Sequence, residues 1–109
     1  MEQNLETFNQ IIAELTTSLK GKLGEQNGAI IVKQGDGHKY HIYRENGRLK
    51  RDYVALIEPK TEPEGDSQKV IGADIDLYDK GALQPIELLF EKYLCPVNIA
   101  KRFGPKPTL

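Results

Sequence analysis

The fold is decided by the stretch NLETFNQIIAELTTSLKGKL, residues 4–23, and by the short run AIIV that follows it at residues 29–32. Apolar side chains recur in the first stretch at spacings of three and four, at Leu5, Phe8, Ile12, Leu15 and Leu19. That spacing predicts an α-helix from about Leu5 to Leu23 with one apolar stripe, and Asn4 is a good residue to cap its N-terminus. The second run is rich in β-branched residues and predicts a buried strand.

Working outward, turn signals divide the middle of the chain into strands. Glycines at 35 and 37 predict a turn before a strand at residues 38–44, and Asn46-Gly47 predicts a two-residue hairpin into a strand at residues 48–58. Pro59 is expected to close that strand, and residues 61–67 have the composition of an exposed loop. Alternating residues 70–79 predict a further strand, and Pro85 is well placed to start a second amphipathic helix. Residues 97–103 are expected to add one or two helical turns.

A two-residue turn at Asn46-Gly47 would fix the register of the central hairpin. Tyr43 would then face Lys50, and Tyr40 would face Tyr53. One face would carry Lys39, His41, Tyr43, Arg48 and Lys50. The other would carry Tyr40, Ile42, Leu49, Tyr53 and Ala55, with Arg44 and Arg51 near the tip. The second face is the more apolar and is expected to pack against a helix.

Together these elements predict an α+β fold. We expect a single domain over residues 1–103 with an N-terminal helix, an antiparallel meander of three or four strands and a C-terminal helix, and both helices on one face of the sheet. Residues 104–109, GPKPTL, are expected to form a tail. The first helix also fits a short heptad seam, which leaves a homodimer open.

Composition narrows the class of protein. The chain has 109 residues, 39% hydrophobic and 28% charged, with a net charge of −1, which is typical of a globular domain and not of a non-specific DNA-coating protein. A single cysteine, Cys95, excludes an internal disulfide and a cysteine-based zinc site. No apolar run is long enough to cross a membrane, and residues 1–4 do not resemble a secretory signal, so we expect no membrane contact and a cytoplasmic location.

Three groups of residues could carry chemistry. Asp74 and Asp76 lie on one side of a predicted strand and could hold a hard cation, but acids on a solvent face also keep a strand soluble. His41 opposite Asp52 could be an oriented base, although no nucleophile accompanies it and a surface pair explains it as well. Cys95 lies near a helix C-terminus, which does not activate a thiol. We therefore expect no cofactor, no metal site and no catalytic residue.

Charge is segregated along the chain. Residues 33–52 hold six basic and three acidic residues, net +3, whereas residues 58–79 hold seven acidic and two basic residues, net −5. If the acidic strand pairs beside the basic hairpin, the charges neutralise across strands. If the two lie apart, the basic side becomes a surface for a protein partner or, with its tyrosines, for single-stranded nucleic acid.

These observations favour a small cytosolic non-enzymatic protein that binds a protein partner as an adaptor, accessory or regulatory subunit. The residues expected to contact the partner are Lys39, His41, Tyr43, Arg48, Lys50 and Arg51. Two alternatives remain at this point: a single-stranded nucleic-acid-binding protein that uses the same hairpin, and a small metal-dependent enzyme at Asp74 and Asp76.

Overall fold

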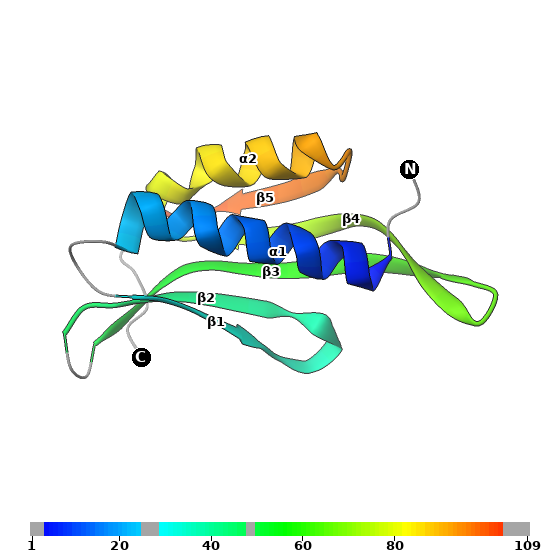
Figure 1. The fold of residues 1–109 in the computed structure, drawn as a ribbon, viewed down its shortest axis with the longest axis horizontal. Helices are drawn as coiled ribbons and strands as arrows, with labels where there is room; N and C mark the ends of the chain where they lie inside the picture. The colour runs from blue at the N-terminus through cyan, green and yellow to red at the C-terminus, as the bar shows by residue number, and fades with distance from the viewer. Residues whose placement is uncertain (1–3, 25–28, 48–49, 104–109) are drawn as a thin grey trace.

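The computed structural model describes residues 4–24, 29–47 and 50–103. It confirms an α+β fold with an N-terminal helix, a mostly antiparallel sheet and a C-terminal helix (Figure 1). The sheet has five strands in the order β1-β2-β3-β4-β5, one strand more than the largest number predicted. The elements in chain order are α1 (Leu5–Leu19), a π turn (Lys20–Gly24), β1 (Ile30–Gln34), a 3-10 turn (Asp36–His38), β2 (Tyr40–Glu45), β3 (Arg51–Glu64), β4 (Ser67–Leu77), a 3-10 turn (Lys80–Ala82), α2 (Leu83–Lys92) and β5 (Val97–Lys101).

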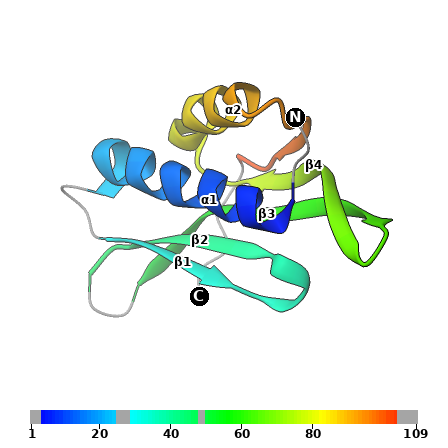
Figure 2. The same cartoon turned by 45° about the vertical axis from the view of Figure 1, so that its right-hand side comes forward.

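Helix α1 forms as its sequence predicts. The side chain of Asn4 accepts a 2.8 Å hydrogen bond from the backbone N–H of Thr7, which satisfies one of the free donors of the first turn. The predicted apolar stripe is buried at Phe8, Ile12, Leu15 and Leu19, although the α-helical part ends at Leu19 and a π turn replaces its last predicted turn. Helix α2 lies beside α1, as two views of the ribbon agree (Figure 2).

The hairpin β2–β3 does not have the predicted register. Tyr43 pairs with Tyr53 and Glu45 with Arg51, so the connection is longer than the two residues expected. The prediction is wrong at the turn itself, where Glu45 pairs with Arg51 and not with Arg48. A bulge in β3 then shifts the register further: Ile42 pairs with Ala55 and Tyr43 with Tyr53, which leaves Val54 as an extra residue. The carbonyl of Val54 accepts the backbone N–H groups of both Tyr78 and Asp79, so the bulge is fixed by the two residues that follow β4. A local turn motif cannot reveal a bulge that residues much later in the chain stabilise.

Strand β3 also continues beyond Pro59, where we expected it to end. It pairs with β4 as far as Glu64 opposite Ser67, and the chain reverses through Gly65 and Asp66 alone. The β2 partner of β3 stops at Ile57, so Pro59 and Pro63 lie where β3 has a neighbour only on its β4 side. A proline costs little stability at such a position, because the side of the strand without a neighbour needs no backbone N–H donor. Residues 61–67, predicted to be a loop, therefore form the end of a projecting hairpin, which we call the arm (residues 61–70; Figure 1).

Residues 97–103, expected to extend the second helix, contain β5 instead. β5 pairs with β4 in the parallel direction, and a parallel pair requires the crossover that α2 provides. Helix α2 ends at Lys92, and Leu94 takes a left-handed backbone with φ 55°, which turns the chain toward the sheet. Leu94 is consequently exposed.

One hydrophobic core joins both helices to alternate side chains of the strands. Its largest fully buried members include Phe8, Leu15, Ile57, Ile75 and Phe90. Tyr40, Ile42 and Ala55 lie in this core as their sequence pattern predicts, and so does Cys95, where burial raises the pKa of the thiol. Between the helices, Lys92 donates to Glu14 at 3.2 Å, and hydrogen bonding to the Tyr93 hydroxyl, followed by Lys92, lowers the pKa of the Glu14 carboxyl.

Candidate functional site

The strand side chains that alternate with the core residues form a second surface of the sheet. We call it the outer face, and its principal members are His41, Tyr43, Tyr53, Leu56, Glu58, Asp74 and Asp76. It has two parts. Aromatic rings occupy the part over β2 and the start of β3, and charged side chains occupy the part over the middle of β3, β4 and β5.

The aromatic part is a row of four rings. His41 stacks on Tyr43 with 6.2 Å between ring centroids, Tyr43 contacts Tyr53 at 4.8 Å, and Tyr53 contacts Tyr78 at 5.6 Å. Tyr43 is only 8% exposed at the centre of this row. Burial, with a smaller contribution from its hydrogen bond to Tyr53, raises the pKa of Tyr43 to about 12. Tyr43 is therefore buried and uncharged at neutral pH at the centre of the row.

The charged part surrounds a shallow groove of about 330 Å³. Its lining includes Leu56, Glu58, Asp74, Asp76, Asn98 and Ala100. Each carboxylate has a basic partner on a neighbouring segment. Lys60 lies 3.3 Å from Asp74, Arg102 donates to Asp76 at 3.0 Å, and Lys39 lies 3.9 Å from Glu58. The acidic strand β4 thus pairs directly with β3. The pairs Lys39–Glu58 and Arg44–Asp79 join the basic stretch to the acidic stretch, whereas Lys60 belongs to the acidic stretch itself and Arg102 to neither, so the segregated charges neutralise one another only in part.

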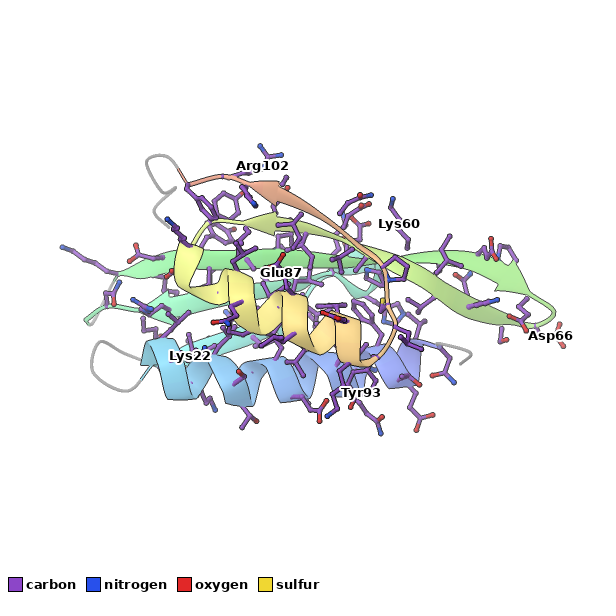
Figure 3. All side chains as sticks on the ribbon, turned by 90° about the horizontal axis from the view of Figure 1, so that it is seen from above. Lys22, Lys60, Asp66, Glu87, Tyr93 and Arg102 are labelled. Atoms are coloured by element: carbon purple, nitrogen blue, oxygen red, sulfur yellow. The ribbon has the colours of Figure 1, made fainter. Side chains whose placement is uncertain are left out.

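A second hollow of about 210 Å³ adjoins the first along β5. It is lined by Lys60, Ile71, Gly72, Pro96, Val97 and Asn98 among others, and Asn98 borders both hollows. Ile71 is 44% exposed here, an unusual value for a large apolar side chain of a sheet. Lys60 and Arg102 project from this side of the molecule (Figure 3). The two hollows share Asn98 of β5, and we refer to them together as the β5 groove.

The residues predicted to contact a partner divide between the two parts. Lys39, His41 and Tyr43 share the outer face, as predicted, and Arg51 joins them through its 3.4 Å ion pair with Glu45. Lys50 is exposed, and Arg48 lies outside the described residues, as does Leu49. Tyr53, assigned to the core face, is instead on the outer face because the bulge at Val54 shifts the register. The binding role of this set stays a prediction.

Sequence reasoning missed Asn98 and Arg102, which line or flank the β5 groove. Both belong to a segment that was expected to be helical, so their position beside Asp74 and Asp76 could not be foreseen. The alternation of residues 97–101 between apolar and polar side chains was the available signal, but five residues after a helix are too few to separate strand from helix.

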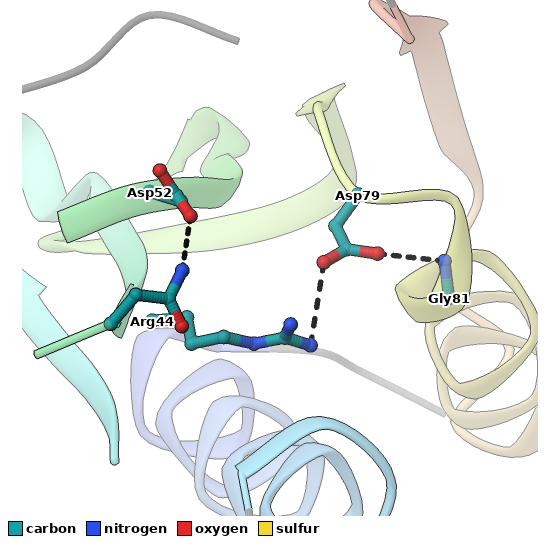
Figure 4. Close-up of polar contacts among 5 residues, drawn as sticks. Arg44, Asp52, Asp79 and Gly81 are labelled. Atoms are coloured by element: carbon teal, nitrogen blue, oxygen red, sulfur yellow. Dashed lines mark hydrogen bonds and ion pairs between the residues drawn. The ribbon is translucent and has the colours of Figure 1, made fainter. Parts of the chain in front are cut away.

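Asp74 and Asp76 do lie on the same side of β4, as the alternation predicts. Their carboxylates form ion pairs with Lys60 and Arg102, respectively. Within residues 4–24, 29–47 and 50–103 no group of three or more potential ligands is arranged to hold a metal ion. Asp79, expected near these two acids, has a different role. It accepts the backbone N–H of Gly81 at 2.9 Å and pairs with Arg44 at 3.5 Å (Figure 4). It therefore ties β2 to the turn before α2.

Two other candidates have structural partners. His41 is not opposite Asp52 but pairs with Leu56, so the predicted histidine–carboxylate contact is absent from the described ladder. The ring of His38 contacts the Gln34 side-chain amide at 2.9 Å in the turn after β1. Asp52 accepts a hydrogen bond from the side chain of Asn46 instead.

No helix in the described part of the chain combines the length and apolar character that a membrane span requires. Comparisons with protein-family models, with curated proteins and with solved structures gave no match.

Proposed function

We propose that this is a small cytosolic protein without enzymatic activity that binds a protein partner as an adaptor, accessory or regulatory subunit. In this proposal α1 and α2 cover one face of the sheet, and the outer face contacts the partner. The proposal is supported by the burial pattern, because both helices contribute to the same core as the side chains that alternate with the outer face.

The observation that carries the proposal is the aromatic row beside the β5 groove. Tyrosine and arginine are enriched where proteins contact one another, and the outer face offers both, with Tyr53 and Tyr78 in the row and Arg102 at the groove. Its ion pairs are exposed to water, and such pairs contribute only about 0–1 kcal/mol each. A partner can therefore exchange its own charges for them at small cost.

The two alternatives have less support from the described residues. Nucleic-acid binding has less support because the chain has a net charge of −1 and lacks the basic excess that phosphate contacts favour. Metal-dependent catalysis needs carboxylates that are free to bind a cation, whereas Asp74 and Asp76 form ion pairs with Lys60 and Arg102. A salt titration with a labelled single-stranded oligonucleotide and calorimetry with Mg²⁺, Mn²⁺ and Ca²⁺ test these alternatives. Binding that weakens as salt rises, or heat on adding a metal, would favour the respective alternative.

The direct test is capture of partners from the native host by immobilised protein, with mass spectrometry to identify what is retained. Asn98→Arg would fill the β5 groove, and Gln84→Arg is its matched control because Gln84 is an exposed residue of α2. A paired variant, Lys39→Glu with Arg51→Glu, tests the basic residues against Lys20→Glu with Lys22→Glu on the π turn.

We expect the two outer-face variants to lose one reproducible partner that the wild type and both controls retain, with unchanged melting temperatures for all five proteins. Retention of the same partner by both outer-face variants would refute the proposed surface. Light scattering on the wild type shows separately whether the retained partner is a second copy of this chain.

A further inference from the structure

The base of the β2–β3 loop contains a reactive dipeptide, Asn46-Gly47. The strand ladder ends at Glu45 opposite Arg51, and the N–H of Asn46 donates to the carbonyl of Lys50 at 2.9 Å. Gly47 is exposed with φ 83°, and a Cβ added to it would meet nothing within 4 Å. Asn46 is not in the left-handed region, so the dipeptide is not locked in the tight turn that its sequence predicts.

This arrangement suits an intramolecular reaction of the asparagine side chain. The backbone nitrogen of Gly47 attacks Cγ of Asn46, which forms an N–Cγ bond and breaks the bond from Cγ to Nδ2. Water takes the proton of the attacking N–H, and the leaving amine takes a proton from water and departs as ammonia. Water then opens the cyclic imide to aspartate or isoaspartate. Asparagine is among the thermolabile residues, and a following glycine offers no side chain to obstruct the attack.

Asp52 connects this reaction to the rest of the hairpin. Its carboxylate, labelled in Figure 4, accepts a hydrogen bond from Nδ2 of Asn46, the atom that would leave. While this hydrogen bond is formed, it holds the leaving amide group of Asn46 in place. After the reaction a carboxylate replaces the amide and faces Asp52, so an attraction becomes a repulsion between like charges. The isoaspartate product also lengthens the backbone by one carbon at the position where the ladder ends.

We infer that Asn46 is a site of spontaneous deamidation, and that its conversion opens the β2–β3 end of the sheet. The change is irreversible and adds one negative charge beside the Glu45–Arg51 pair on the outer face. It requires water and no other reactant. The inference does not depend on the proposed function.

The test is a time course of the full-length folded protein in warm, mildly alkaline buffer, with peptide mapping by mass spectrometry. We expect residue 46 to gain the mass difference between NH2 and OH, and Asn9 and Asn98, which no glycine follows, to stay unchanged. Asp52→Ala should accelerate the reaction several-fold, and Gly47→Ala should slow it several-fold. Urea-unfolded protein is the control for intrinsic reactivity. A folded protein that stays intact at residue 46 while the unfolded chain converts would overturn the inference.

The structural consequence has its own measurement, because Asn46→Asp creates the aspartate product directly. We expect its melting temperature to fall below that of the wild type and to recover when Asp52→Asn is added. Amide exchange should be faster for residues 43–45 in the single variant than in the double variant. Equal melting temperatures for the wild type and Asn46→Asp would refute the opening of the hairpin, whatever the rate of deamidation.

Discussion

At one end of β3 the chain turns through a wide loop between Glu45 and Arg51, and at the other end it turns through Gly65 and Asp66 alone. The first hairpin, with β2, contributes Ile42 and Ala55 to the core and carries the aromatic row on its outer face. The second, with β4, extends past the core into the arm, whose residues 61–68 are all exposed. Two hairpins that share a strand thus depend on different interactions.

The difference teaches that turn motifs are least reliable where tertiary contacts are strongest. Asn46-Gly47 is the better hairpin signal by sequence, yet packing and the bulge at Val54 override it. Residues 61–68 of the arm are all exposed, so no core packing overrides their local preferences. There the glycine at 65, with φ 61°, sets the turn although the surrounding prolines and acids resemble a loop. Four measurements sharpen or break this comparison.

The largest effect should come from removing core packing of β3 on the body side. Ile57 is fully buried and pairs with Tyr40 and Ile75, so Ile57→Ala should lower the free energy of unfolding by about 2–5 kcal/mol. Thr61→Ala, four residues along the same strand but in the arm, is the control and should change it by less than about 0.5 kcal/mol. Urea unfolding monitored by circular dichroism measures both. Similar losses would show that the arm is as tightly coupled to the core as the body.

A smaller effect is expected at Gly72, which pairs with Lys60 where the body passes into the arm. A Cβ on Gly72 would lie 2.9 Å from the carbonyl oxygen of Pro96, and that oxygen is held by the N–H of Ala73. Gly72→Ala should therefore cost about 1–3 kcal/mol of stability by forcing β4 and β5 apart. Thermal melting gives the cost, and faster amide exchange in β5 than in β1 would locate it. Uniform exchange would contradict this explanation.

The turn of the arm provides the third test. Gly65→Ala places a side chain at φ 61° and should cost about 1–2 kcal/mol, while Gly65→Asn should cost less because asparagine tolerates this region. Gly47→Ala, at φ 83°, should cost less than Gly65→Ala because a wider loop can relax. If the alanine at position 47 is the more destabilising of the two, the β2–β3 loop is the more constrained turn and the comparison is reversed.

The smallest effect at neutral pH is that of Tyr43→Phe, because the phenol is uncharged in both folded and unfolded protein. The folded pKa of about 12 lies above the ordinary value of 10, so the folded state holds the proton more tightly. The resulting stability is present below pH 10 and is lost as the pH rises from 10 to about 12. Denaturant melts across this range should show a shallower fall for Tyr43→Phe than for the wild type. Parallel curves would contradict a buried, neutral Tyr43.

Much of the fold follows from the sequence. The stripe from Leu5 to Leu19 and the alternation of Tyr40 and Ile42 with His41 and Tyr43 depend on local periodicity, and both are correct. The position of Tyr53 could not be predicted, because it depends on the bulge at Val54, whose carbonyl bonds to Tyr78 and Asp79 much later in the chain. The β5 groove could not be predicted either, since it requires a parallel pair between residues 24 positions apart. A pairing between distant segments leaves little signal in the sequence of either segment alone.

Strand order also has a consequence for the growing chain on the ribosome. β5 is translated after α2 and after the four strands that precede it, yet its place is beside β4. Until residue 97 and those after it leave the exit tunnel, the backbone groups of Ala73 and Leu77 that bond to Pro96 and Arg102 have no partner. A nascent chain that pauses at this point displays an open strand edge, the kind of surface that chaperones cover and that neighbouring nascent chains can pair with.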